Sequence, residues 1–217
     1  MIRQSMVACG GIALVFLNAC TPASVQQNEK NSATLYLQLG ERYFQLDKLA
    51  IAHENLMHAL SLDAENAQVY HALALLNEKR RHFDEAHAHY ENALQRQPSD
   101  MRIQNNYGRF LCQQGQWQQG ITLLEQAVND VRNDHAWQAM TNMGVCYRQQ
   151  GDRRNAEHYF ITALQLNAAY LPALVEMQKI CDEKGDTAGA QAYLMRYQRQ
   201  ILIQFPHAQD ANTFNSQ

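Results

Sequence analysis

The sequence has little of what marks nucleic-acid-binding, membrane-spanning or metal-binding proteins. Its 217 residues include 18 Lys and Arg against 21 Asp and Glu. It therefore lacks the basic excess that neutralises phosphates, and we expect no binding to nucleic acid. No segment, including one short apolar run near the N-terminus, reaches the roughly 20 apolar residues that a membrane-spanning helix needs. No pair of its Cys residues shows the C-x-x-C spacing of zinc and redox sites.

Catalytic motifs are also missing. The chain has no His-Glu-x-x-His, no Gly-x-Ser-x-Gly and no Gly-rich phosphate loop. Its densest His group is His82, His87 and His89. Two metal ligands on one helix face must be three or four residues apart, whereas neighbours in this group are five and two apart. We interpret them as solvated surface residues and predict no enzyme activity, catalytic site, metal, cofactor or small-molecule substrate.

What the sequence does contain is a repeat of about 34 residues. Segments that start at residues 33, 67, 101, 137 and 171 place the same residue classes at the same positions. The twentieth position is always small: Ala52, Ala86, Gly120, Ala156 and Ala190. The eighth position is small in four segments: Gly40, Ala74, Gly108 and Gly144. Small residues let the axes of two antiparallel helices approach to about 8–10 Å. One such hairpin cannot bury its apolar face alone, so the units must stack.

This pattern resembles the tetratricopeptide repeat, most clearly in the second unit. There the family's aromatic, Leu, small, Ala, aromatic, Ala and Pro positions hold Tyr70, Leu73, Ala74, Ala86, Tyr90, Ala93 and Pro98. The resemblance implies an all-α fold, a right-handed superhelical solenoid of about five helix-turn-helix pairs. The units are 33–66, 67–100, 101–136, 137–170 and 171–204. The third is about two residues longer, which we assign to a stretched connection at 130–135, and 205–217 is a polar C-terminal tail.

The N-terminus has the pattern of an export signal. Arg3 precedes an apolar run, residues 6–17, that is too short to span a membrane, and residues 1–19 are predicted to be a signal peptide. The run ends in Leu-Asn-Ala-Cys20, which resembles the bacterial lipobox and implies cleavage before Cys20 and acylation of its thiol and amine. Two or more acyl chains give stable membrane anchoring. The alternative is an ordinary cleaved signal that leaves Cys20 as a free thiol.

The residues that follow Cys20 bear on location. Thr21, where Asp would retain an enteric lipoprotein in the inner membrane, favours the periplasmic face of the outer membrane by resemblance to the family's sorting rule. Residues 20–32 are expected to be the lipidated Cys and a flexible polar tether.

Three further Cys residues lie on the first helices of units three to five. Stacked helices lie about 8–10 Å apart, whereas bridged Cys residues need Cα atoms about 4.4–6.8 Å apart. We therefore expect no disulfide. Cys146 and Cys181 are predicted to be buried as small apolar residues, and Cys112 to lie near the concave face.

Function in such a solenoid is expected on the concave groove, which the first helix of each unit lines. The candidate partner-binding residues there are Leu37, Phe44, His71, Leu75, Arg102, Asn105, Arg109 and Arg148. The apolar members could receive apolar side chains, and the Arg and Asn residues can donate hydrogen bonds to main-chain carbonyls or a carboxylate. A partner peptide or helix in the groove is the expected ligand.

Units three and four carry a narrower resemblance. The stretch 104–112, Gln-Asn-Asn-Tyr-Gly-Arg-Phe-Leu-Cys, and the stretch 142–146, Asn-Met-Gly-Val-Cys, are similar to the type IV pilus biogenesis and stability lipoproteins of the PilW/PilF family. This resemblance implies a pilotin, which binds subunits of the outer-membrane secretin of the type IV pilus and promotes their localisation and assembly. One alternative is a tetratricopeptide-repeat lipoprotein that serves as an adaptor for cell-wall synthases or hydrolases. Another, from a different class, is a periplasmic enzyme or metal carrier that uses His87 and His89.

Overall fold

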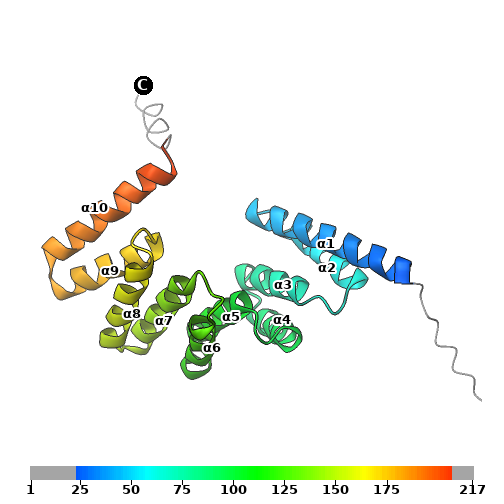
Figure 1. Cartoon of the computed structure of the whole chain (residues 1–217), viewed down its shortest axis with the longest axis horizontal. Coiled ribbons are helices and arrows are strands. Elements are labelled where there is room, and N and C mark those ends of the chain that lie inside the picture. Colours follow the sequence, from blue (N-terminus) through cyan, green and yellow to red (C-terminus); the bar gives the residue numbers. More distant parts are fainter. Residues whose placement is uncertain (1–22, 207–217) are drawn as a thin grey trace, which may run out of the picture.

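The computed structural model describes residues 23–206, and the regular structure of that part is entirely helical (Figure 1). Its ten helices are α1 (Ala23–Gln45), α2 (Leu49–Leu62), α3 (Ala67–Lys79), α4 (Phe83–Arg96), α5 (Met101–Gln113), α6 (Trp117–Asn129), α7 (Ala136–Gln150), α8 (Arg153–Leu166), α9 (Leu171–Lys184) and α10 (Thr187–Gln204). Consecutive helices form five pairs, α1–α2 to α9–α10. The expectation of an all-α chain of repeated helix pairs is confirmed.

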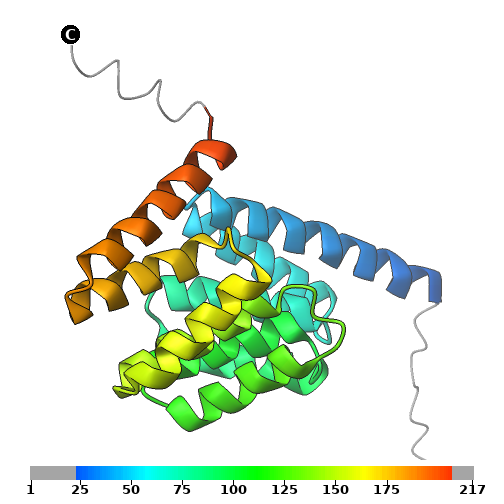
Figure 2. The ribbon, with the colours of Figure 1, turned by 60° about the vertical axis from the view of Figure 1, so that its left-hand side comes forward.

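The five pairs follow one another along an arc, with α1–α2 at one end and α9–α10 at the other (Figures 1 and 2). The second helix of each pair contacts the first helix of the next pair, as α2 contacts α3 and α6 contacts α7. First helices of successive pairs also touch, as α5 touches α7. Stacking therefore buries the apolar face that a single pair would leave exposed.

Glycine allows the closest approaches within the pairs. A Cβ atom added to Gly108 on α5 would lie 2.8 Å from the carbonyl oxygen of Gly120 on α6. One added to Gly120 would lie 2.6 Å from the carbonyl oxygen of Gly108. In the next pair, a Cβ on Gly144 would meet the ring of Phe160 at 2.6 Å. The small eighth and twentieth positions therefore set the distance between paired helices, as the sequence indicates.

The prediction of a flexible tether is wrong for residues 23–32, because α1 begins at Ala23 and includes them. The side chains of Val25 to Ser32 are exposed, so their polarity reflects the absence of a packing neighbour and not an irregular backbone. The helix is already nucleated by the packed segment that follows, and adding further turns costs little. Gln27 donates from Nε2 to Oδ1 of Asn31 at 3.1 Å along this part of the helix. The predicted signal peptide, Cys20 and the tail after 206 lie outside the described residues.

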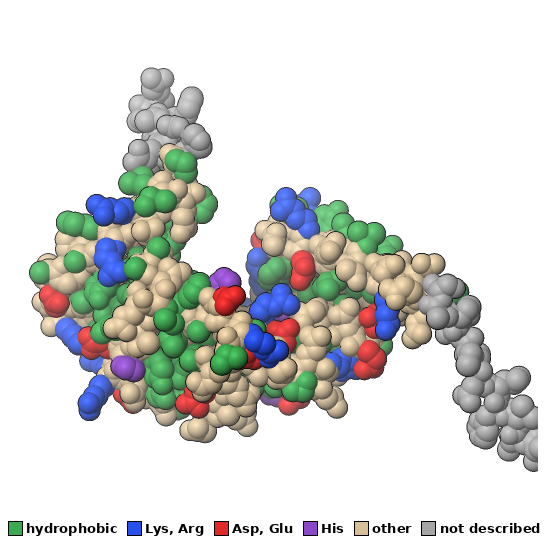
Figure 3. Space-filling model, in the orientation of Figure 1, with side chains coloured by type: hydrophobic (Ala, Val, Ile, Leu, Met, Phe, Trp, Pro, Cys, Tyr) green, Lys and Arg blue, Asp and Glu red, His purple; other side chains and the backbone are tan. Residues whose placement is uncertain are grey.

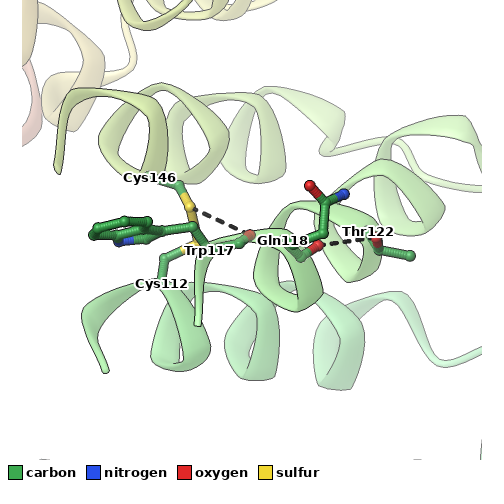
Figure 4. The surroundings of a disulfide bond; sticks show 5 residues. All are labelled: Cys112, Trp117, Gln118, Thr122 and Cys146. Atoms are coloured by element: carbon green, nitrogen blue, oxygen red, sulfur yellow. Dashed lines mark hydrogen bonds between the residues drawn. A yellow bond between two sulfur atoms is a disulfide. The ribbon is translucent and has the colours of Figure 1, made fainter. Parts of the chain in front are cut away.

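The structure also corrects the expectation of no disulfide, because Cys112 of α5 is bonded to Cys146 of α7 (Figure 4). Their Cα atoms are 5.3 Å apart. The error came from comparing a distance between helix axes with a distance between Cα atoms. Each Cα lies about 2.3 Å from its axis, so two facing Cα atoms are about 4.6 Å closer than the axes. Cys112 is only 3% exposed and therefore does not line a concave face.

The remaining described Cys behaves as expected. Cys181 is buried and free, and burial is the largest of the influences that raise the pKa of its thiol. Near the disulfide, Sγ of Cys146 lies 3.9 Å from the carbonyl oxygen of Trp117 at the start of α6 (Figure 4). Of the helices in residues 23–206, none combines the length and the apolar character needed to cross a membrane.

Candidate partner-binding groove

The inner side of the arc holds a groove of about 760 Å³, called here the central groove. It runs from the C-terminal half of α1 across α3 to the first turns of α5 and α7. Figure 3 shows a hollow between the two arms of the arc, with basic, acidic and His side chains gathered at its base. The lining residues are Glu41, Phe44, Leu56, His71, Ala72, Leu75, Ser99, Asp100, Met101, Arg102, Asn105, Asn106, Arg132, Asn133, Asp134, His135, Gln138 and Ala139.

Five of the eight candidate residues from the sequence line this groove. They are Phe44, His71, Leu75, Arg102 and Asn105. Phe44 on α1 and Leu75 on α3 are half-buried, and these two groove-lining side chains are called here its apolar floor. Arg102 is more exposed, and its guanidinium donates to Oε1 of Gln68 at 2.9 Å. The groove thus combines an apolar end with a polar end that can form hydrogen bonds.

The other three candidates serve the fold. Leu37 is buried in the core that joins the first two pairs, where it packs with Leu56 and Leu73. Arg148 of α7 forms an ion pair with Glu176 of α9 at 3.0 Å. Neither Leu37 nor Arg148 is among the lining residues of the central groove. First-helix positions of a repeat contribute to contacts between neighbouring units as well as to the groove. The sequence alone did not show which of these two roles each residue has.

Arg109, the third of these candidates, belongs to a network that ties α3, α4 and α5 together. Its guanidinium donates to both carboxylate oxygens of Glu78, at 2.6 and 2.8 Å. The hydroxyl of Tyr90 donates to Oε2 of the same carboxylate at 3.0 Å. Burial, followed by the negative charge of Glu78, raises the pKa of Tyr90 well above its ordinary value. Arg109 is therefore engaged in a partly buried, bidentate ion pair.

His71 forms part of the groove floor and is buried, with 8% of its surface exposed. Burial lowers its pKa from 6.5 to about 4, although the nearby charge of Asp100 works in the opposite direction. The ring is therefore neutral at pH 7. Nδ2 of Asn106 lies 2.9 Å from Nε2 of His71, and a neutral ring can accept this hydrogen bond. Burial of the imidazole thus fixes the orientation of an amide in the groove.

The low pKa of His71 predicts a pH-dependent stability. The folded-state pKa of about 4 is below the unfolded value of 6.5, so the unfolded chain takes up the proton first as the pH falls. The contribution is complete above pH 6.5 and is lost progressively between pH 6.5 and 4, at most about 3 kcal/mol in all. Urea unfolding of His71→Gln at several pH values should show this pH dependence reduced. His82→Gln, at an exposed position, should keep the wild-type profile, and equal profiles for wild type and His71→Gln would refute the assignment.

Sequence reasoning missed the contribution of the connection between α6 and α7. Four of its residues line the groove, Arg132 to His135, and so does Asn106 on α5. The available signal was the extra length of the third unit, which the sequence located at 130–135 without assigning it to the groove. Insertions in repeat proteins often lie on the binding face.

The His group of α4 is less solvated than the sequence suggested. His82 is exposed, but His87 and His89 are half-buried. Nε2 of His87 lies 3.3 Å from the hydroxyl of Tyr107. Burial, followed by the charge of His53, lowers the pKa of His89. Within residues 23–206, no three or more His, Cys, Asp and Glu side chains cluster in a way that could hold a metal ion.

Comparison with known proteins agrees with this architecture. Two models of the tetratricopeptide repeat match the chain, one over residues 67–110 and the other over residues 99–169. Together they cover the pairs from α3–α4 to α7–α8, which carry most of the central groove.

Individual relatives extend the match along the chain. The type IV pilus assembly protein PilF of Pseudomonas aeruginosa is 25% identical over 188 residues, which are 87% of this chain and 75% of PilF. The solved structure of that PilF superposes with a TM-score of 0.72 at 25% identity, covering 80% of this chain and 78% of PilF. The crystal structure of PilW, described as a widely conserved type IV pilus biogenesis factor, gives a TM-score of 0.72 at 25% identity, with 78% and 77% of the two chains covered. The chain therefore contains tetratricopeptide repeats, is homologous to PilF and shares the fold of PilF and PilW.

Proposed function

We propose that this protein is an outer-membrane lipoprotein that acts as a pilotin, binding secretin subunits of the type IV pilus through its solenoid. The observation that supports this most is the homology to a type IV pilus assembly protein over 87% of the chain. The match spans the helix pairs that form the central groove. Tetratricopeptide-repeat solenoids hold other polypeptides on such surfaces, so binding, and not catalysis, is the proposed activity.

The proposed location rests on the N-terminal sequence and receives support from the disulfide. Disulfides persist in oxidising compartments such as the periplasm and are rare in the cytosol, and Cys112 and Cys146 form one. Acylation of Cys20 would leave only Thr21 and Pro22 between the lipidated residue and α1, which starts at Ala23. In this arrangement the N-terminal end of α1 would lie near the membrane.

The proposed mechanism combines affinity for the membrane and affinity for the secretin in one chain. The acyl chains bind the bilayer and the groove binds a secretin segment. A secretin subunit held by the solenoid is then concentrated at the membrane, as in tethered binding generally. Phe44 and Leu75 can receive an apolar side chain of that segment, while Arg102 and Asn105 can donate hydrogen bonds to its main-chain carbonyls.

The decisive variant is Cys20→Ser. It removes the acylated thiol and leaves the solenoid unchanged, so we expect the purified protein to bind secretin subunits as wild type does. In cells, the secretin should be lost from the outer-membrane fraction, measured by fractionation and immunoblotting. Normal outer-membrane secretin rings in this variant would remove the mechanism. If affinity capture with the wild-type protein recovered cell-wall synthases or hydrolases in place of secretin, the adaptor function would replace the pilotin.

A further inference from the structure

The connection between α6 and α7 is longer than the other three that join one helix pair to the next. Those three have four residues each, 63–66, 97–100 and 167–170, whereas this one has six, 130–135. Its residues Arg132 to His135 line the central groove. The two additional residues therefore enlarge the wall of the proposed binding site.

The connection is held in one conformation by its own hydrogen bonds. The main-chain N–H and the Nε of Arg132 both donate to Oδ1 of Asp130 at 2.9 Å. Nδ2 of Asn133 donates to the carbonyl oxygen of Ala127 at 2.6 Å, which fastens the connection to the end of α6. The N–H of His135 donates to Oδ1 of Asn133 at 2.9 Å. A loop fixed in this way loses little conformational entropy when a partner binds.

The charges of this region nearly cancel. Hydrogen bonds from the side chain and the main chain of Arg132 lower the pKa of Asp130 to about 2, so the two residues remain an ion pair at neutral pH. The charged residues that line the groove are Glu41, Asp100 and Asp134 against Arg102 and Arg132, a formal balance of −1 with His neutral. Electrostatic complementarity therefore favours a weakly charged ligand and disfavours a polyanion.

Val131 is the second residue of this connection and directly precedes the groove-lining residue Arg132. Its surface is 98% exposed, the highest value among the exposed large apolar side chains of the described residues. Exposed apolar residues are common singly; this one differs because it is presented on a fixed turn beside a groove with an apolar floor. Its area can be buried by a partner without any rearrangement of the protein.

We propose that residues 130–135 form a recognition rim for a weakly charged polypeptide segment lying in the central groove. Val131 packs against one apolar side chain of the segment, and the floor of Phe44 and Leu75 receives another. The inference rests on the proposed function, because the segment is taken to belong to the secretin. The inference adds which surface contacts the partner and what chemical character the bound segment has.

Site-specific photo-crosslinking of the full chain in its own cells tests the rim and the function separately. Benzoylphenylalanine is placed at position 131, at groove position 138, or at position 161 on α8, which is 40% exposed and outside the groove lining. We expect secretin peptides, identified by mass spectrometry, at positions 131 and 138 and not at 161.

Each other pattern overturns a part of the proposal. Adducts at 131 and 138 with a different identified protein would support the rim and refute the secretin partner. Secretin adducts at 138 alone would refute the rim and leave the proposed function standing. Adducts with lipid only, or no adduct at either position, would refute both.

A binding measurement adds a matched pair of variants. Val131→Thr keeps the side-chain shape and exchanges one methyl group for a hydroxyl, so the affinity for purified secretin subunits should fall about fivefold. Val25→Thr makes the same change at an exposed position of α1 outside the groove lining and should bind as wild type does. Both positions are exposed, so thermal unfolding should be nearly unchanged. Equal affinities for Val131→Thr and wild type would refute the contact.

Discussion

Reduction of the Cys112–Cys146 disulfide is expected to lower the free energy of unfolding by about 4 kcal/mol. The two residues are 34 apart in sequence, and opening a closed loop of that size restores roughly this much conformational entropy to the unfolded chain. The bond also joins α5 to α7, the first helices of neighbouring pairs at the middle of the arc. In a solenoid each unit contacts only its neighbours, so loss of the link should also broaden the unfolding transition.

The measurement is urea unfolding with and without a reductant, repeated on a Cys112→Ala/Cys146→Ala variant. The variant should match the reduced wild type and should not respond to the reductant. Cys181→Ala is the control, because Cys181 is free and its replacement should leave the response to the reductant intact. If reduction leaves the midpoint of unfolding in place, the disulfide does not stabilise the solenoid.

Replacement of Glu78 by Ala is expected to destabilise the protein by about 3 kcal/mol. The carboxylate accepts two hydrogen bonds from Arg109 and one from Tyr90, and the side chains of Arg109 and Glu78 are only 25% and 15% exposed. Removal of Glu78 leaves a partly buried guanidinium without its counter-charge. This destabilises the protein by more than the intact ion pair stabilises it. Thermal or urea unfolding of Glu78→Ala measures the effect.

Two further variants test that explanation. Lys79→Ala removes the adjacent ion pair with Asp47, whose side chains are 43% and 74% exposed, and should cost less than about 1 kcal/mol. Glu78→Leu combined with Arg109→Met removes both charges and should recover much of the stability lost in Glu78→Ala. A double variant as unstable as Glu78→Ala would show that an unpaired guanidinium is not the cause.

The groove illustrates how far positions in a repeat predict a site. Counting along the first helices identified Phe44, His71, Leu75, Arg102 and Asn105, because in several units these positions face the inside of the arc. The same count also selected Arg109, which is paired with Glu78 on the preceding unit. Whether a long side chain such as that of Arg109 faces the groove or an adjacent unit depends on the acidic side chains of that adjacent unit. The sequence of a single repeat does not contain this information.

The sequence by itself determined the repeated helix pairs, because small residues at fixed intervals allow two antiparallel helices to pack closely. It also located the stretched connection at 130–135, through a break in the register. Only the tertiary structure decided that this connection borders the groove and that α1 continues back to Ala23. It alone decided that Cys112 and Cys146 meet at 5.3 Å. These features depend on distances between atoms of different units, which the repeat pattern leaves open because it constrains each pair only within itself.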